Sequence, residues 1–191
     1  MMRKIHDDEK FENLDFQKIG PDQGDYESCS FITCDFTNSD LSGINFLDCE
    51  FTGCNLTLTN LTDTSLKAVK FKSCKFTGIR FEDCNKLMFS VSFDSCTLDV
   101  CSFYKMRMKN TSFINSRISE SDFEEADLCC SSFLNCDLVK SVFNHTNLEK
   151  VDFSSSFNYS IDPESNSIKK ARFSLPGLSG LLDKYDIEIE N

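Results

Sequence analysis

The most reactive side chains in this 191-residue chain are its eleven cysteines. Four of them recur at intervals of 20, 20 and 22 residues, at Cys34, Cys54, Cys74 and Cys96. Thiols at a regular spacing could hold a soft metal ion or form a redox ladder. Such sites usually contain two cysteines separated by two residues, or paired histidines, and the chain has neither arrangement. The alternative interpretation is that these cysteines are small, polarizable core residues.

The other candidates for catalysis form no constellation that a motif identifies. His6 and His145 are the only histidines, and no motif places a cysteine or serine beside either. The chain contains no glycine-rich phosphate-binding loop, no HExxH pattern and no GxSxG pattern. We therefore expect no catalytic, cofactor-binding or metal-binding residues and no enzymatic activity. Cys129 and Cys130 are out of step with the other cysteines, and we expect them to be partly exposed and open to oxidation.

The elements that would position these side chains follow a period of five residues. From Phe93 to Phe153 every fifth residue is large and apolar, and the residues between are mostly polar or small. An amphipathic helix repeats at about 3.6 residues and a half-buried strand at about 2, so the pattern fits neither element. It predicts a solenoid of short repeats. An earlier run with the same period extends from Tyr26 to Phe81.

The repeated motif resembles the pentapeptide-repeat family, whose consensus is A(D/N)LXX. The resemblance covers residues 26–153 and implies an all-β fold, the right-handed quadrilateral β-helix. In that fold four pentapeptides form one square coil, and the central Phe or Leu of each points inward. The residue two positions before the centre also points inward in this family and is small, which explains most of the cysteines as core residues. Matching stretches are Ser39-Asp40-Leu41-Ser42-Gly43, Cys54-Asn55-Leu56-Thr57-Leu58, Ala126-Asp127-Leu128-Cys129-Cys130 and Thr146-Asn147-Leu148-Glu149-Lys150.

A four-sided coil makes a test possible within the sequence, because residues 20 apart should then stack. Met88 follows Phe81 by seven residues instead of five, so we expect a bulge with two extra residues near 83–87 and a stacking interval of 22 across it. Under this rule like residues lie above like, and Met88 is expected to point inward. One column is entirely phenylalanine: Phe31, Phe51, Phe71, Phe93, Phe113, Phe133 and Phe153.

We divide the chain into three parts. Residues 1–25 are expected to be a partly mobile N-terminal cap that includes His6, and residues 26–157 the β-helix. Residues 158–191 are expected to contain a loop, a last partial coil, a short helix near 178–185 and a dimerisation tail. The tail alternates polar and apolar residues over 186–190, as a final strand would. No apolar run approaches the roughly 20 residues that span a membrane, and the start lacks a signal-peptide core, so we expect a cytoplasmic protein.

Acidic residues dominate the chain, with 31 Asp and Glu against 20 Lys and Arg and a formal net charge of −11. This balance disfavours direct binding to nucleic acid or to an anionic membrane. Residues 19–66 carry eight acidic and no basic residues, residues 67–117 carry ten basic and four acidic ones, and residues 118–164 carry ten acidic and two basic ones. A surface that only maintains solubility is the alternative interpretation. The candidate partner-binding acidic band is Asp122, Glu124, Glu125, Asp127, Asp137 and Asp152.

The layout of residues 158–191 is similar to that of the Qnr-type quinolone-resistance branch of the family. This resemblance implies a rod-like homodimer joined at its C-termini, whose acidic surface imitates B-form DNA and binds DNA gyrase or topoisomerase IV. The chain differs from that branch in lacking long projecting loops and in its basic middle stretch, whose role the sequence leaves open. The alternative is a structural or interaction scaffold with an unknown protein partner. The expected dimer interface contains Phe173, Leu175, Leu178, Leu181, Leu182, Tyr185, Ile187 and Ile189.

Overall fold

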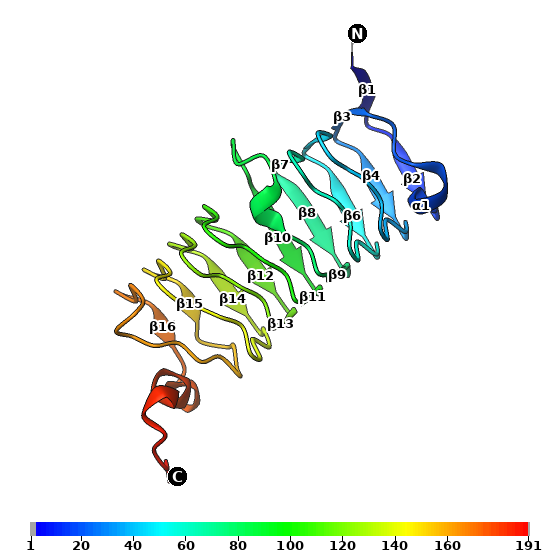
Figure 1. Cartoon of the computed structure of the whole chain (residues 1–191). Helices are drawn as coiled ribbons and strands as arrows, with labels where there is room; N and C mark the ends of the chain where they lie inside the picture. The colour runs from blue at the N-terminus through cyan, green and yellow to red at the C-terminus, as the bar shows by residue number, and fades with distance from the viewer. Residues whose placement is uncertain (1–2, 191) are drawn as a thin grey trace.

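The computed structural model describes residues 3–190 and is a rod of stacked square coils. The two ends of the chain lie at opposite ends of the rod (Figure 1). Residues 20 apart pair in parallel, as Phe31 does with Phe51 and Phe93 with Phe113. The expected quadrilateral β-helix is confirmed. Residues 1–2 of the expected cap and residue 191 of the expected tail lie outside the described residues.

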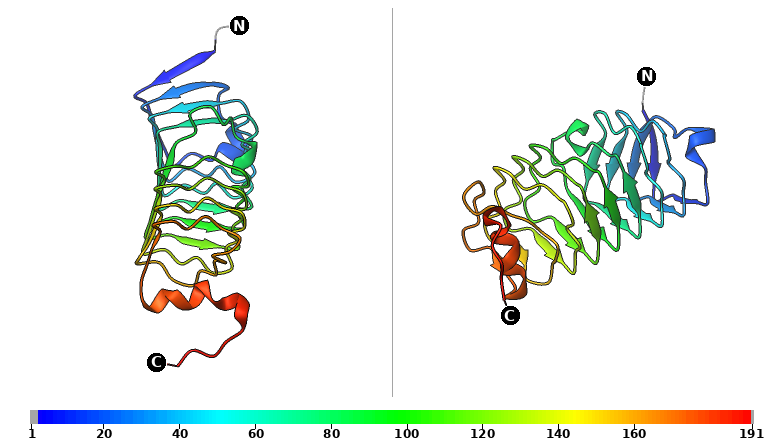
Figure 2. Two further views of the ribbon diagram at one scale, coloured as in Figure 1. Left: turned by 90° about the vertical axis from the view of Figure 1, so that its left-hand side faces the viewer. Right: turned by 60° about the horizontal axis from the view of Figure 1, so that its bottom comes forward.

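The strands are short and form three parallel sheets that run along the rod (Figures 1 and 2). The four-stranded sheet contains β1 (Lys4–Asp7), β3 (Gly24–Glu27), β5 (Asn45–Leu47) and β7 (Ser65–Lys67). The nine-stranded sheet contains β2 (Lys10–Glu12), β4 (Ser30–Ile32), β6 (Glu50–Thr52), β8 (Val69–Lys72), β10 (Val91–Asp94), β12 (Ser112–Ile114), β14 (Ser132–Leu134), β15 (Asp152–Phe153) and β16 (Arg172–Phe173). The three-stranded sheet contains β9 (Lys75–Thr77), β11 (Thr97–Asp99) and β13 (Arg117–Ser119). Elsewhere the coils are joined by single bridges.

We number the four sides of the rod by their inward columns. Side 1 is centred on Tyr26, Phe46, Leu66, Met108, Leu128 and Leu148, and side 2 on Phe31, Phe51, Phe71, Phe93, Phe113, Phe133 and Phe153. Side 3 is centred on Phe36, Leu56, Phe76, Leu98, Ile118 and Leu138, and side 4 on Leu41, Leu61, Phe81, Phe103, Phe123 and Phe143. Sides follow one another in this order within each coil, so sides 3 and 4 are neighbours, as are sides 4 and 1.

The core is a set of aromatic stacks along these columns. The Phe113 ring lies 4.5 Å from the Phe133 ring at an interplanar angle of 4°, and 5.1 Å from the Phe93 ring at 11°. Rings of neighbouring columns meet edge-on, as Phe113 and Phe123 do at 88°. Both geometries are favourable for aromatic pairs. The stacking follows from the backbone, because strands in a sheet are about 4.8 Å apart and a flat ring needs little more.

The corners of the square explain the period of five. One residue in almost every repeat has a left-handed backbone, for example Val100 at φ 54°, Lys105 at φ 56° and Asn110 at φ 58°. This conformation is unfavourable for residues other than glycine. Ladder hydrogen bonds between coils hold it in place, such as Asn110 N–H to Cys129 O at 3.1 Å. A corner of this kind after nearly every short side sets the repeat length through the backbone.

The irregularity between the two runs lies close to the expected bulge, and its inward residue differs from the expected one. After the 3₁₀ turn η1 (Phe81–Asp83), Asn85 still bridges Ser65 at an interval of 20, whereas Phe93 pairs with Phe71 at 22. The two extra residues therefore lie between Asn85 and Val91, a stretch that overlaps the expected range 83–87 at Lys86 and Leu87. Met88 is 71 % exposed, so the expectation that it points inward is wrong. Phe89 packs against the core in its place, with its ring 6.4 Å from that of Phe81.

The N-terminal segment is more ordered than the sequence suggested. Strands β1 and β2 and the helix α1 (Phe16–Ile19) form the first coil, which stacks directly on the next. His6, which was expected in a mobile start, lies in this coil, and only 4 % of the residue is exposed. Its ring stacks on Tyr26 at 4.5 Å and 5°, and its Nδ1 lies 3.0 Å from Glu9 Oε2. The imidazole of His6 thus extends the aromatic column of side 1 by one coil. The pattern of large apolar residues did not include this position, because histidine is polar.

The C-terminal segment ends in two short 3₁₀ turns, η2 (Pro176–Leu181) and η3 (Asp183–Tyr185), where a helix was expected. Before them, Tyr159 and Ile161 are buried and complete the last coil, although the strict pattern fails at Asn158 and Pro163. The expected strand over 186–190 does not form. Alternation produces a strand only where a sheet edge can pair with it, and this tail extends beyond η3, away from the coils (Figure 2).

We expect the aromatic stack to dominate stability. Phe113→Ala removes a fully buried ring from the middle of its column and should lower the free energy of unfolding by about 3–5 kcal/mol in a urea titration. The matched control is Phe157→Ala, because half of the Phe157 residue is exposed, and its cost should stay below about 1 kcal/mol. Equal costs for the two variants would contradict this account of the core.

Candidate partner-binding surface

The side chains that could bind a metal ion are dispersed over the described part of the chain. Across residues 3–190, no group of three or more His, Cys, Asp or Glu side chains is arranged to hold a metal ion. None of the helices in that range combines the length and apolar character needed to cross a membrane. The outward-facing side chains are therefore the place to look for a site.

The regularly spaced cysteines are core residues, as the second interpretation predicted. Cys54, Cys74 and Cys96 are buried, and their thiols donate to the carbonyl oxygens of Phe31, Phe51 and Phe71 at 3.3–3.4 Å. Each thiol thus bonds to a carbonyl of the neighbouring coil and fills space beside a stacked ring. Other core cysteines are made less reactive by burial, which raises the pKa of Cys49, Cys84 and Cys101 to about 12.

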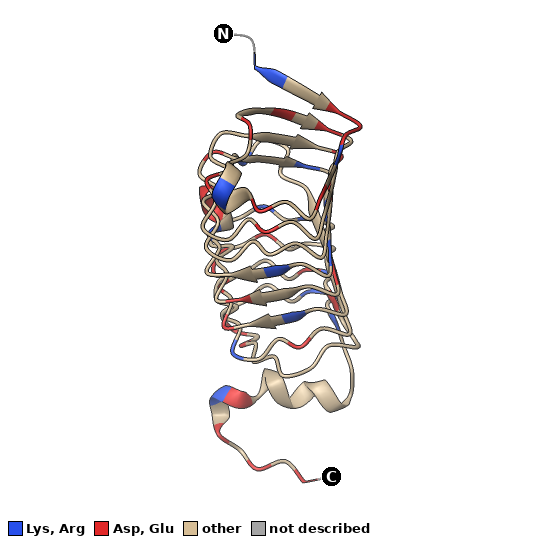
Figure 3. Cartoon of the chain, turned by 90° about the vertical axis from the view of Figure 1, so that its right-hand side faces the viewer, with Lys and Arg blue, Asp and Glu red and all other residues tan. Residues whose placement is uncertain are grey.

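The candidate acidic band does not gather on one side of the rod. Asp122, Glu124 and Glu125 lie on side 4 and its corner with side 1, in the repeat centred on Phe123. The other three residues are spread over the remaining sides, because each precedes a central residue of a different column: Asp127 on side 1, Asp152 on side 2 and Asp137 on side 3. Figure 3 shows the same mixing, with acidic and basic segments alternating along the rod. A single flat partner could contact only two neighbouring sides.

Basic residues of adjacent coils pair with half of this band. Lys105 Nζ lies 3.3 Å from Glu125, Lys109 Nζ lies 3.2 Å from Asp127, and Arg172 Nη1 lies 3.0 Å from Asp152. These partners lie 18 to 20 positions apart in sequence. A coil of 20 residues would have predicted these ion pairs. A count of charges along the sequence does not, because it assigns the two partners of each pair to different stretches.

Three members of the band form no ion pair within residues 3–190. They are held by neutral donors: Asn144 Nδ2 donates to Glu124 at 3.1 Å, and Asn158 Nδ2 donates to Asp137 at 2.8 Å. Asp122 accepts the backbone N–H of Glu124 at 2.8 Å, a local turn that Asp and Asn make throughout the repeats. Asp122 and Glu124 on side 4 and Asp137 on side 3, where Arg117 is its ladder neighbour, thus form no ion pair among residues 3–190, and we call them the unpaired acidic group.

The expected dimer interface lies at the open end of the rod. Phe173 and Leu181 pack against the core and are partly buried, and the remaining members are at least a third exposed. The largest exposed fractions are those of Leu175 at 84 %, Ile189 at 56 % and Ile187 at 55 %. Exposed apolar side chains are thus concentrated where the solenoid ends. The basic Lys184 joins this segment to the last coil through ion pairs with Asp162 at 2.8 Å and Glu164 at 2.6 Å.

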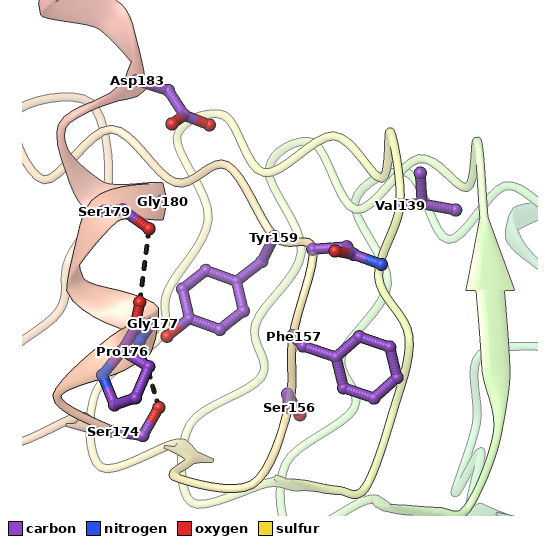
Figure 4. A pocket seen from close by; sticks show the side chains of 11 residues that line it. Val139, Ser156, Phe157, Tyr159, Ser174, Pro176, Gly177, Ser179, Gly180 and Asp183 are labelled. Atoms are coloured by element: carbon purple, nitrogen blue, oxygen red, sulfur yellow. Dashed lines mark hydrogen bonds between the residues drawn. The ribbon is translucent and has the colours of Figure 1, made fainter. Parts of the chain in front are cut away.

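A cavity of about 590 Å³ is lined by residues of the last coil and of η2, beside the place where the two are in direct contact (Figure 4). The half-exposed Phe157 and the buried Tyr159 line it on the coil side. Tyr159 also sets how closely η2 approaches. A Cβ atom at Gly180 would lie 2.1 Å from the carbonyl oxygen of Tyr159, and one at Gly177 would lie 2.0 Å from its hydroxyl oxygen. Two glycines are needed for the C-terminal segment to dock.

Gly180→Ala should therefore loosen the C-terminal segment. The added methyl group collides with backbone, and Gly180 O accepts Ile161 N–H at 2.9 Å, so we expect a loss of about 1–3 kcal/mol of stability. Faster trypsin cleavage after Lys184 would report the undocking. Ser179→Ala at the exposed neighbouring position is the control and should leave the cleavage rate unchanged. An unchanged rate for Gly180→Ala would show that the close contact does not hold the segment.

Comparisons with known proteins agree with this geometry. A family model for a pentapeptide repeat region matches residues 25–87, and a model of eight pentapeptide repeats matches residues 107–144 and 116–154. No curated protein sequence matches the chain.

Two forms of one solved protein show the same fold. A trypsin-treated form of QnrB1, a plasmid-mediated fluoroquinolone resistance protein, is 17 % identical, with a TM-score of 0.67 over 100 % of this chain and 93 % of that one. A second trypsin-treated form is 16 % identical, with a TM-score of 0.59 over 98 % and 100 %. HetL, a pentapeptide repeat protein involved in heterocyst differentiation regulation in the cyanobacterium Nostoc sp. strain PCC 7120, is 11 % identical, with a TM-score of 0.49 over 91 % and 86 %. With two matching repeat models and the coils described above, this chain belongs to the pentapeptide-repeat family.

Proposed function

We propose that this pentapeptide-repeat protein binds DNA gyrase or topoisomerase IV as an acidic mimic of B-form DNA, and so protects the enzyme from quinolones. The supporting observation is the density of charge along the rod. Each coil of 20 residues advances by about 4.8 Å, the spacing of hydrogen-bonded strands. Residues 118–164, with ten acidic and two basic residues, then carry about one net negative charge per 1.4 Å. B-form DNA carries one per about 1.7 Å of its axis.

The ion pairs narrow the part of this surface that would contact the enzyme. Lys105, Lys109 and Arg172 screen three carboxylates of the candidate band on sides 1, 2 and the corner of side 4. The unpaired acidic group keeps its charge on sides 3 and 4, which are neighbours. A basic DNA-binding groove could hold these two sides at once, so we assign the contact to Asp122, Glu124 and Asp137.

The fold likeness to QnrB1 supports the choice of partner. That protein is described as a fluoroquinolone resistance protein, and its rod matches this chain along the whole length. The basic stretch 67–117 disfavours DNA mimicry less than its sequence suggests. Lys72, Lys105 and Lys109 each pair with a carboxylate of an adjacent coil, so part of the positive charge is already neutralised on the surface.

We further propose that two copies join at their C-terminal ends. An isologous contact would bury the exposed apolar residues that cluster there, led by Leu175, Leu178 and Leu182. It would also cover the open end of the solenoid and bring the two acidic stretches 118–164 toward the centre of one long rod. A protein made of two such rods offers a longer acidic surface to a groove that accepts duplex DNA.

Neutralising the unpaired group tests the mimicry. Asp122→Asn combined with Glu124→Gln keeps side-chain size and removes two charges from side 4. We expect about tenfold more protein to be needed to inhibit gyrase-catalysed supercoiling, or to rescue it from a fluoroquinolone, which corresponds to about 1.4 kcal/mol of binding free energy.

The matched control is Glu149→Gln combined with Asp152→Asn, which removes the same charge from sides 1 and 2. It should leave the supercoiling assay unchanged. Equal losses in both variants would indicate a response to net charge alone. If the wild-type protein affects neither gyrase nor topoisomerase IV at micromolar concentration, the mimicry proposal fails and a scaffold with another protein partner becomes the better explanation.

The dimer proposal has its own variant. Leu178→Asp combined with Leu182→Asp places two charges in the C-terminal apolar surface and should convert a dimer into a monomer in light scattering coupled to size exclusion. Val142→Asp makes the same kind of change at a half-exposed position on side 4 and should leave the mass unchanged. A monomeric wild-type chain would contradict the proposal directly.

A further inference from the structure

Two neighbouring cysteines face outward on side 1, in contrast to all the others. Cys129 is partly exposed and Cys130 is exposed, whereas the remaining nine cysteines are buried. The two sulfur atoms lie 3.6 Å apart. At the corresponding positions of the adjacent coils the side chains are those of Lys109 and Asn110 on one side and Glu149 and Lys150 on the other. This coil alone presents a pair of thiols.

The backbone holds the pair in place. Cys130 occupies a left-handed corner at φ 63°, and its N–H donates to Glu149 O at 2.9 Å. The carbonyl of Cys129 accepts Asn110 N–H at 3.1 Å, and its N–H donates to Asp127 Oδ1 at 3.3 Å. Both residues are thus fixed to the coils above and below. A ligand that bridges the two sulfur atoms would not have to order a flexible loop first.

The distance between the sulfur atoms selects the chemistry. Two bonds of about 2.3 Å that meet at a bent centre, with an angle between about 90° and the tetrahedral value, place their sulfur atoms about 3.3–3.8 Å apart, a range that contains the 3.6 Å found here. A linear ion with the same bond length would need about 4.6 Å. A disulfide is disfavoured, because adjacent Cα atoms are about 3.8 Å apart and disulfides usually join Cα atoms about 4.4–6.8 Å apart. Zinc needs about four ligands, and no third ligand group completes such a site within residues 3–190.

We propose that Cys129 and Cys130 form a dithiol site that captures a trivalent arsenical with one organic substituent, a centre that needs only two thiolates and binds them in a bent geometry. With an organoarsenic oxide, two arsenic–sulfur bonds form and the bonds between arsenic and its oxygen break. The two thiol protons leave with that oxygen as one water molecule. The arsenic stays trivalent, so the reaction requires no oxidant or reductant.

Exposure makes this pair the accessible one among the cysteines. The hydrogen bond to the Cys130 thiol raises the pKa of Cys129, and the nearby charge of Lys109, whose Nζ lies 3.2 Å from Asp127, acts in the opposite direction. Burial raises the pKa of the core thiols, that of Cys136 to about 11, and hides them from a bulky reagent.

Phenylarsine oxide is a direct probe. The full-length protein should retain one phenylarsenic group per chain in intact-mass spectrometry in the presence of excess glutathione, and release it to 1,2-ethanedithiol. Peptide mapping should place it on the segment that contains Cys129 and Cys130. Cys129→Ser and Cys130→Ser should each lose it, because a single arsenic–sulfur bond is exchanged by glutathione.

The matched control is Cys136→Ser, which changes a buried cysteine six residues further along the chain. This variant should retain the phenylarsenic group. Circular dichroism of each variant checks the fold, which exposed substitutions should not change. Absence of a glutathione-resistant adduct on the wild-type protein would overturn the proposal. Retention of the adduct by either single-serine variant, or its mapping to a core cysteine, would do the same.

Discussion

The structure depends on the parallel hydrogen-bond ladder that places residues 20 apart directly above each other. Strand pairs such as Phe93 with Phe113, and corner bonds such as Cys130 N–H to Glu149 O, fix that interval on every side. Because the ladder sets a rise of about 4.8 Å, a flat ring in one coil meets a flat ring in the next at contact distance. The backbone and the aromatic core therefore specify the same repeat.

The same ladder decides where charge lies. A residue on the surface has its nearest neighbours one coil away, so Glu125 meets Lys105 and Asp152 meets Arg172. Charges that look segregated along the sequence are neighbours in space. What remains is a smaller negative surface on two sides, carried by Asp122, Glu124 and Asp137, and this is the part that the proposed function uses. The thiol pair at Cys129 and Cys130 shares the coil but faces side 1 and its corner with side 2.

The five-residue pattern was enough to predict most of the core. The all-phenylalanine column, the interval of 22 across the irregularity and the burial of the regularly spaced cysteines are all confirmed. The errors occur where the period is interrupted. Leu87, Met88 and Phe89 are all apolar, and composition cannot say which one points inward, so the choice of Met88 was wrong. His6 was missed because an imidazole does not count as apolar, although it stacks on Tyr26 as an aromatic ring.

The sequence by itself determined the fold, the coil length and the identity of the inward columns, because each of these is repeated many times and a single ambiguous repeat changes nothing. The tertiary structure alone decided which side each acidic residue faces, which carboxylates are paired and how closely the C-terminal turns approach Tyr159. These properties depend on contacts between coils and between the last coil and η2. Such contacts occur once each, so no periodicity in the sequence reports them.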